Sequence, residues 1–211
     1  MMTTEPFRHL VADNWFAPEL CRAACAEWPD ERWPYWLRYE GARGSKYVTR
    51  DPDRLTPACK ALVQQMLGLR LDGLLYLPDT FPDTSLYGAG MSMFLRGSDL
   101  PLHLDSDHNP ITKWERAASA ILYLSECDGG ELQLWNRTGI RVDKWVAPKV
   151  GRLVIFECGD TSWHSVAPVI AGRRLALSLF FWRQPAADFE PRRPRAEFAC
   201  EKTTFSPKEN S

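Results

Sequence analysis

Apolar residues follow a helical period in two segments near the start of the chain. In residues 18–28 they recur three and four positions apart after Pro18, and proline is tolerated in the first turn of a helix. The same spacing predicts a second helix that begins at Thr56-Pro57 and ends at Gly68. We therefore expect residues 1–90 to form helices and loops that pack on a larger body.

From about residue 91 the pattern changes to short segments in which apolar and polar residues alternate, as in half-buried strands. Turns that contain glycine separate several of these segments, at residues 127–130, 148–151 and 171–172. Short strands at regular spacing are typical of a jelly roll or a closed sandwich. The pattern predicts strands over residues 91–95, 101–105, 117–125, 131–135, 139–146, 152–157, 164–169 and 174–182.

The pattern predicts a mainly β (α+β) fold in a single domain with three parts. Residues 1–90 form the helical and loop part, residues 91–183 form the β core, and residues 184–211 form a polar, proline-rich tail. A length of 211 residues and a mass of 24.1 kDa fit one domain. The six cysteines include no CxxC motif, so we expect free thiols.

Charge and hydropathy exclude several classes of function. A net charge of −1 provides no basic footprint for nucleic acid or for an anionic membrane. The longest apolar stretches have about eight residues, whereas a helix that spans a bilayer needs about 20. The N-terminus, MMTTEPFRHL, lacks the apolar core of a secretory signal. We expect a cytoplasmic protein with no nucleic-acid partner and no membrane association, and its oligomeric state stays open.

Two of the four histidines, His103 and His164, lie where a metal site could form. His103 and Asp105 alternate at the end of a predicted strand, so both side chains point to one face. His164 opens another predicted strand about sixty residues later, and such strands can be neighbours in a jelly roll. Two histidines and one carboxylate on one face of a metal are the ligand set of non-haem Fe(II) oxygenases, because the open positions can take a co-substrate and O₂.

The predicted strand over residues 174–182 has two different faces. Its odd positions carry leucines and a phenylalanine, which belong in packing. Its even positions begin with Arg174, Ala176 and Ser178, a set that suits the wall of a pocket for a slim dicarboxylate. Arg174 is then placed for a bidentate contact with a carboxylate, and the alternation favours it over Arg173.

His103-x-Asp105, His164 and Arg174 resemble the HxD…H…R signature of Fe(II)/2-oxoglutarate-dependent dioxygenases, in the prolyl-4-hydroxylase-like branch. The resemblance implies that these four residues are catalytic and that His103, Asp105 and His164 hold Fe(II). It also implies a double-stranded β-helix, a cupin-like jelly roll, with the N-terminal helices packed on it. Supporting segments extend the resemblance over residues 85–182: RAASAILYLS at 116–125, GGEL at 129–132, GRLVIF at 151–156 and SWHSV at 162–166.

The resemblance further implies the co-substrates 2-oxoglutarate and O₂. 2-Oxoglutarate would chelate the iron through its C1 carboxylate and 2-oxo group. Its far carboxylate would be held by Arg174 and the Tyr123 hydroxyl, with Ser178 on the same wall; a plain core position is the alternative for Tyr123. Two positions depart from the branch. Phe94 lacks the hydroxyl of the tyrosine often found there, so one hydrogen bond to the co-substrate is lost or supplied elsewhere, and Ser125 replaces an asparagine.

The implied activity is hydroxylation of an unactivated C–H bond with release of succinate and CO₂. Asp105 favours hydroxylation over chlorination, because halogenases of the family replace this carboxylate with a small residue. We expect a polar small molecule as the substrate, since the chain has no evident peptide-binding module. Two alternatives stay open: a hydroxylase of a prolyl or other residue on a partner protein, and a non-catalytic, cupin-like metal-binding scaffold.

Several residues near the expected pocket have no assigned role. For His108 we favour a position in a surface loop over a contact with substrate. Trp135 fits a packed position and the mouth of the pocket equally well. The remaining residues of this set are charged: Arg96, Asp99 and Arg141.

Overall fold

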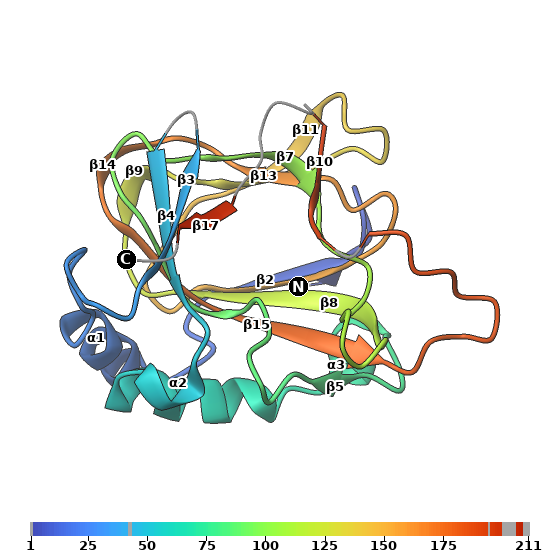
Figure 1. The fold of residues 1–211 in the computed structure, drawn as a ribbon, viewed down its shortest axis with the longest axis horizontal. Coiled ribbons are helices and arrows are strands. Elements are labelled where there is room, and N and C mark those ends of the chain that lie inside the picture. Colours follow the sequence, from blue (N-terminus) through green and yellow to red (C-terminus); the bar gives the residue numbers. More distant parts are fainter. Residues whose placement is uncertain (1, 42–43, 194, 200–205, 209–211) are drawn as a thin grey trace.

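The computed structural model describes residues 2–41, 44–193, 195–199 and 206–208. Two antiparallel sheets face each other, and the helices lie along the outer side of the larger sheet (Figure 1). The larger sheet has ten strands, in the order β1 (Met2–Thr3), β2 (His9–Ala12), β12 (Leu153–Glu157), β8 (Glu115–Tyr123), β15 (Arg174–Arg183), β6 (Gly90–Phe94), β4 (Gly44–Thr49), β3 (Leu37–Gly41) and β17 (Ser206–Lys208), with β5 (Phe81–Pro82) also paired to β15.

The smaller sheet has five strands and carries part of the site. Their order is β11 (Val142–Val146), β10 (Leu132–Trp135), β13 (His164–Val166), β7 (Leu100–Leu104) and β16 (Glu197–Phe198). A separate pair joins β9 (Cys127–Gly129) to β14 (Val169–Gly172). Along the chain β6, β8, β12 and β15 belong to the larger sheet, and β7, β10 and β13 between them belong to the smaller one. This alternation is the winding of a double-stranded β-helix, so the predicted fold class is confirmed.

The helices cover the outer face of the larger sheet. They are α1 (Pro18–Ala26), α2 (Pro57–Leu67) and α3 (Leu71–Leu75), with a short 3-10 turn at Pro52–Arg54. Proline stands in the first turn of α1 and α2, and Gly68 caps the C-terminal end of α2, where the sequence predicts the helix to stop. Leu62 and Met66 of α2 are fully buried in one core cluster with Leu177 and Leu179 of β15. The odd positions of β15 therefore pack outward against helices.

The space between the two sheets holds a second, smaller core cluster. The larger sheet contributes Tyr123, Val154, Phe156 and Ala176, and the smaller sheet contributes Leu132, Leu134 and Val146. Ala176 is an even position of β15, so the even face of that strand points inward. The alternation predicted for this strand is confirmed: Arg174 is buried and Arg173 is exposed.

The N-terminal part holds strands that the sequence pattern did not predict. β2 pairs with β12, and the β3–β4 hairpin extends the larger sheet beyond β6. Tyr47, Val48 and Thr49 of β4 are all buried, so this strand lacks the polar alternation by which half-buried strands are recognised. The division of the chain at residues 90 and 183 stays a prediction.

Several predicted strand and turn boundaries differ from the structure; for example, the turn predicted at 171–172 lies inside β14. The strand predicted at 164–169 is two strands, β13 and β14, because Pro168 between them has no N–H to give to a ladder. The strand predicted at 139–146 begins only at Val142, because the side chain of Asn136 accepts hydrogen bonds from the backbone of Ile140 and Arg141 in a turn. The turn predicted at 127–130 contains β9.

The C-terminal tail contributes two strands to the body. β16 pairs with β7 and β17 pairs with β3. Cys200 lies outside the described residues, and the other five cysteines are free thiols. No helix in the described part of the chain combines the length and apolar character needed to cross a membrane.

Candidate active site

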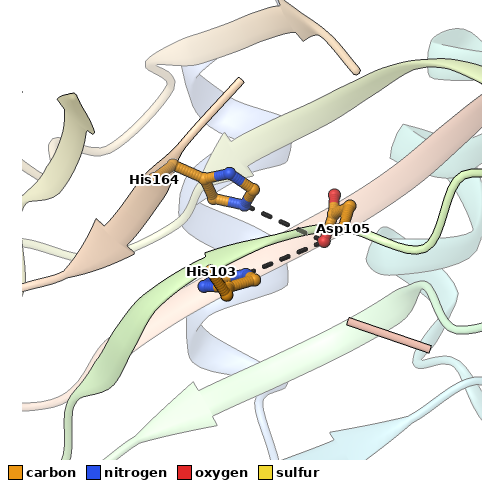
Figure 2. A group of neighbouring side chains, drawn as sticks. All are labelled: His103, Asp105 and His164. Carbon is orange, nitrogen blue, oxygen red and sulfur yellow. Dashed lines mark ion pairs between the residues drawn. The ribbon is translucent and has the colours of Figure 1, made fainter. Parts of the chain in front are cut away.

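The three predicted metal ligands meet at one end of the space between the sheets (Figure 2). His103 lies near the end of β7 and Asp105 follows directly after that strand. β13 pairs with β7 so that His164 stands opposite His103. The Nε2 atom of each histidine is 3.8 Å from Asp105 Oδ1, and one ligand atom from each of the three residues lies within 4.8 Å of the others.

The two imidazoles present the nitrogen that a metal would need. Nδ1 of His103 is 2.8 Å from the carbonyl oxygen of Pro101, and Nδ1 of His164 is 2.9 Å from that of Ser162. A carbonyl only accepts hydrogen bonds, so each Nδ1 carries the proton and donates it. In the neutral form of each ring, Nε2 then carries the free lone pair, and both Nε2 atoms lie on the side of Asp105. This is the donor set, with its supporting carbonyls, that suits a divalent transition metal.

The charges around the ligands favour the protonation states that bind a metal. Burial lowers the pKa of His103 to about 3, and the neighbouring His164 adds to this effect, so the ring is neutral. Burial raises the pKa of Asp105, but the positive charge of Arg116, together with the hydrogen bond from Ser119, outweighs this effect, and the net shift is downward. Asp105 Oδ2 lies 3.3 Å from Arg116 Nη1 and accepts a 2.9 Å hydrogen bond from the Ser119 hydroxyl. Oδ1 is left to face the imidazoles.

Aromatic rings enclose the three ligands. The ring of Phe156 lies 4.8 Å from the His164 ring, and the ring of Phe198 lies 5.3 Å from the His103 ring, measured between centroids. Phe198 belongs to β16, so the C-terminal tail contributes to this wall. These rings limit the access of water from two sides.

Arg174 is oriented by two hydrogen bonds at its buried position on β15. Its Nε donates to the carbonyl oxygen of Gly130 at 2.9 Å, and its Nη2 donates to the Tyr123 hydroxyl at 3.0 Å. Nη1 takes part in neither bond. Ser178 is partly buried on the same inward face of β15, four residues from Arg174. The roles of Arg174, Tyr123 and Ser178 toward 2-oxoglutarate stay predictions.

A cavity of about 370 Å³ adjoins the ligand Asp105 and its partner Arg116. Its lining is rich in charged residues of both signs, which include Glu115, Asp160, Arg183 and Arg193. A larger cavity of about 510 Å³ lies around Glu126, Lys149 and Arg152, and none of the three ligands lines it. Of these two cavities, only the smaller one is lined by a predicted metal ligand, Asp105.

The structure places the five residues that had no assigned role. The expectation of a surface loop for His108 is wrong: this residue is buried, and its Nδ1 lies 2.6 Å from a carboxylate oxygen of Asp107. Trp135 donates its indole N–H to the Ser165 hydroxyl at 2.7 Å. Of the three charged residues, Arg141 is exposed and paired with Asp143, Arg96 is exposed, and Asp99 is partly buried.

Sequence reasoning missed four residues around this site: Lys46, Arg116, Ser119 and Phe198. Ser119 lies on a predicted strand, and its alternation with Tyr123 could have placed it on the inward face. Lys46 lies in β4, where only helices and loops were expected. Phe198 lies in the tail, where no local pattern indicates a strand of two residues.

Residues 89–182 match a family described as the 2OG-Fe(II) oxygenase superfamily. Prolyl 3-hydroxylase 2 of Mus musculus is 35% identical over 71 residues, which are 33% of this chain and 10% of that protein. Prolyl 3-hydroxylase 1 of Homo sapiens is 37% identical over 95 residues, which are 44% of this chain and 13% of that protein. The aligned segment therefore spans only about a tenth of the length of these relatives.

Two solved structures share the fold. A prolyl-4-hydroxylase from Pseudomonas putida superposes with a TM-score of 0.58 at 24% identity, over 84% of this chain and 93% of that one. A prolyl hydroxylase from Trichoplax adhaerens, in complex with a hypoxia inducible factor oxygen degradation domain peptide fragment, gives a TM-score of 0.58 at 16% identity, over 82% and 83%.

These comparisons contradict the expectation of a small-molecule substrate. The relatives are named prolyl hydroxylases, and one of them was solved with a peptide bound. The expectation failed because it required a separate peptide-binding module, which a double-stranded β-helix of this size does not need.

Fe(II), 2-oxoglutarate and O₂ are the cofactor and co-substrates of the matching family. The family match covers residues 89–182, and the double-stranded β-helix and the two-histidine, one-carboxylate centre agree with it, so this part of the chain is similar to the 2OG-Fe(II) oxygenase superfamily.

Proposed function

We propose that the chain is an Fe(II)- and 2-oxoglutarate-dependent hydroxylase that acts on a prolyl or other residue of a peptide or protein. The observation that carries this proposal is the convergence of the Nε2 atoms of His103 and His164 and one carboxylate oxygen of Asp105 in a largely buried site. The second atom of each ligand group is bound elsewhere, so the donor atoms are held ready for a metal.

Different residues of the chain would bind the metal and the co-substrate. His103, Asp105 and His164 would hold Fe(II), which supplies, with 2-oxoglutarate and O₂, the oxidation of a C–H bond and the release of succinate and CO₂. Arg174, fixed by Tyr123, would hold the far carboxylate of 2-oxoglutarate in a charge-assisted contact. The protein thus orients the reacting groups and limits access of water.

The cavity beside Asp105 supports a peptide as the substrate. It has a volume of about 370 Å³, and its polar lining suits a backbone with hydrogen-bonding groups better than an apolar ligand. Several of the similar proteins are named prolyl hydroxylases, which supports proline as the first residue to test.

The test uses the full chain with Fe(II), 2-oxoglutarate and a panel of proline-containing peptides. Each peptide is paired with a copy in which alanine replaces the proline, and succinate and peptide mass are measured together. We expect succinate formation that depends on proline, with a gain of one oxygen atom in the peptide, and no product from His103→Ala. If succinate forms but no peptide gains oxygen, the proposed substrate class is wrong. Absence of succinate in every mixture would contradict the proposed chemistry.

A further inference from the structure

Lys46 shares an inward-facing row with Phe94 and Arg174. In the larger sheet, Lys46 of β4 pairs directly with Phe94 of β6, and Phe94 pairs directly with Arg174 of β15. Residues directly opposite on antiparallel strands project to the same face of the sheet. Arg174 is on the face that points into the space between the sheets, so Lys46 projects into that space as well.

The Lys46 ammonium and the Arg174 guanidinium lie near one aromatic ring. Lys46 Nζ is 5.6 Å from the centroid of the Phe94 ring, and Arg174 Cζ is 5.2 Å from it. Burial lowers the pKa of Lys46 to about 8; the positive charge of Arg174 contributes to this shift, and the negative charge of Asp105 opposes it. The charge of Lys46 thus interacts both with Arg174 and with the predicted metal ligand Asp105.

Within the part of the chain that the structure describes, the Lys46 ammonium also lacks a hydrogen-bonding or ionic partner. Its side chain is nevertheless partly buried. A cation in a partly dry site beside a second cation costs free energy unless an anion offsets it. A dicarboxylate that extends between Arg174 and the metal ligands would bring two negative charges into this space.

Phe94 lies between the two cations and has no polar atom in its side chain, so it cannot donate a hydrogen bond to a ligand in this space. Lys46 is its direct neighbour across the strand pair, and its ammonium carries three donors.

We propose that Lys46 binds 2-oxoglutarate directly, as a second cationic contact beside Arg174. This inference rests on the proposed function, because it assigns one more residue to the same co-substrate. It requires that the β3–β4 hairpin, and not only the β core, contribute to the site.

The test measures equilibrium binding and not turnover. The full chain is loaded with Mn(II), and 2-oxoglutarate is titrated by calorimetry into wild type, Lys46→Met and Lys46→Arg. Loss of one charge-assisted hydrogen bond should raise the dissociation constant of Lys46→Met about 10- to 100-fold, while Mn(II) affinity and melting temperature stay at wild-type values. Lys46→Arg keeps the charge and should retain most of the affinity. Lys60→Met, on the outer helix α2, is the matched control and should bind as wild type does.

The possible failures are distinguishable. If wild type binds 2-oxoglutarate and Lys46→Met binds it equally well, the assignment of Lys46 is wrong while the proposed function stands. An equal loss in Lys46→Arg and Lys46→Met would indicate a packing effect and would also overturn the assignment. If wild type itself does not bind 2-oxoglutarate, the proposed function fails together with the inference.

Discussion

Each of the three predicted ligand residues directs one side-chain atom toward the position of the metal. A second side-chain atom of the same residue makes a hydrogen bond or an ion pair with the protein. Backbone carbonyls hold the Nδ1 atoms of His103 and His164, and Arg116 with Ser119 holds Oδ2 of Asp105. Such partners fix the tautomer and the direction of a ligand. The site is therefore organised before any metal binds.

Arg174 and Arg173 provide a matched pair of variants at the residue scale. Arg174 is buried and bonded to Tyr123, whereas Arg173 is exposed. We expect Arg174→Ala to weaken 2-oxoglutarate binding by about 2–5 kcal/mol, because a buried charge-assisted contact is lost. Arg173→Ala should change it little. Calorimetric titration of both variants checks this, and a reversed result would mean that the strand faces are assigned incorrectly.

Much of the site could be predicted from the sequence because its chemistry lies on alternating strands. His103 and Asp105 differ by two positions, and Arg174 heads a strand whose two faces differ in size and polarity. Ser119 and Arg116 were not predicted, because a serine or an arginine in a strand has no distinctive spacing. Their role depends on the distance to Asp105, which only the fold sets.

At the scale of elements, the pairing of β7 with β13 creates the metal centre. It places His164 opposite His103 although about sixty residues separate them in the chain. The eight strands of the β core could be predicted because each is short, regularly spaced and bounded by turns. β3, β4 and β16 could not, since they gain their stability by pairing with strands distant in sequence and have weak local patterns.

β16 brings the tail against the site, and this contact can be tested. Phe198 places its ring 5.3 Å from the His103 ring, so Phe198→Ala should admit water beside a ligand. We expect more 2-oxoglutarate to be converted without hydroxylation of the peptide. The ratio of succinate to hydroxylated peptide, measured in both proteins, should rise in the variant. An unchanged ratio would show that the tail does not protect the site.

At the scale of the whole molecule, the larger apolar core cluster and the polar site lie on opposite faces of the larger sheet. The outer face of the larger sheet packs against α1, α2 and α3, while the inner face carries the polar site beside a smaller apolar cluster. Because the larger apolar cluster stabilises the fold from the outer face of the sheet, the inner face can accommodate buried charged side chains. This separation agrees with the two faces predicted for residues 174–182.

The buried histidines also make the stability of the metal-free protein depend on pH. The pKa of His103 is about 3 in the folded state and 6.5 in its ordinary state. Between these values the unfolded chain binds a proton that the folded chain does not, so stability falls as pH drops from 6.5 toward 3. One such proton changes stability by at most about 1.4 kcal/mol per pH unit. Urea unfolding at several pH values should show this fall, with a smaller slope in His103→Asn; an equal slope would contradict the assignment to His103.

In the proposed hydroxylase, Asp105 and the two histidines hold the iron. The most direct test compares wild type with Asp105→Gly on whichever peptide the proline panel identifies, and it measures succinate and hydroxylated peptide in the same reaction. Asp105 lies just after β7 and contributes little to the apolar core, so the variant should fold. We predict equimolar succinate and hydroxylated peptide from wild type and loss of most of both products from Asp105→Gly. Hydroxylation by Asp105→Gly at the wild-type rate would contradict the account.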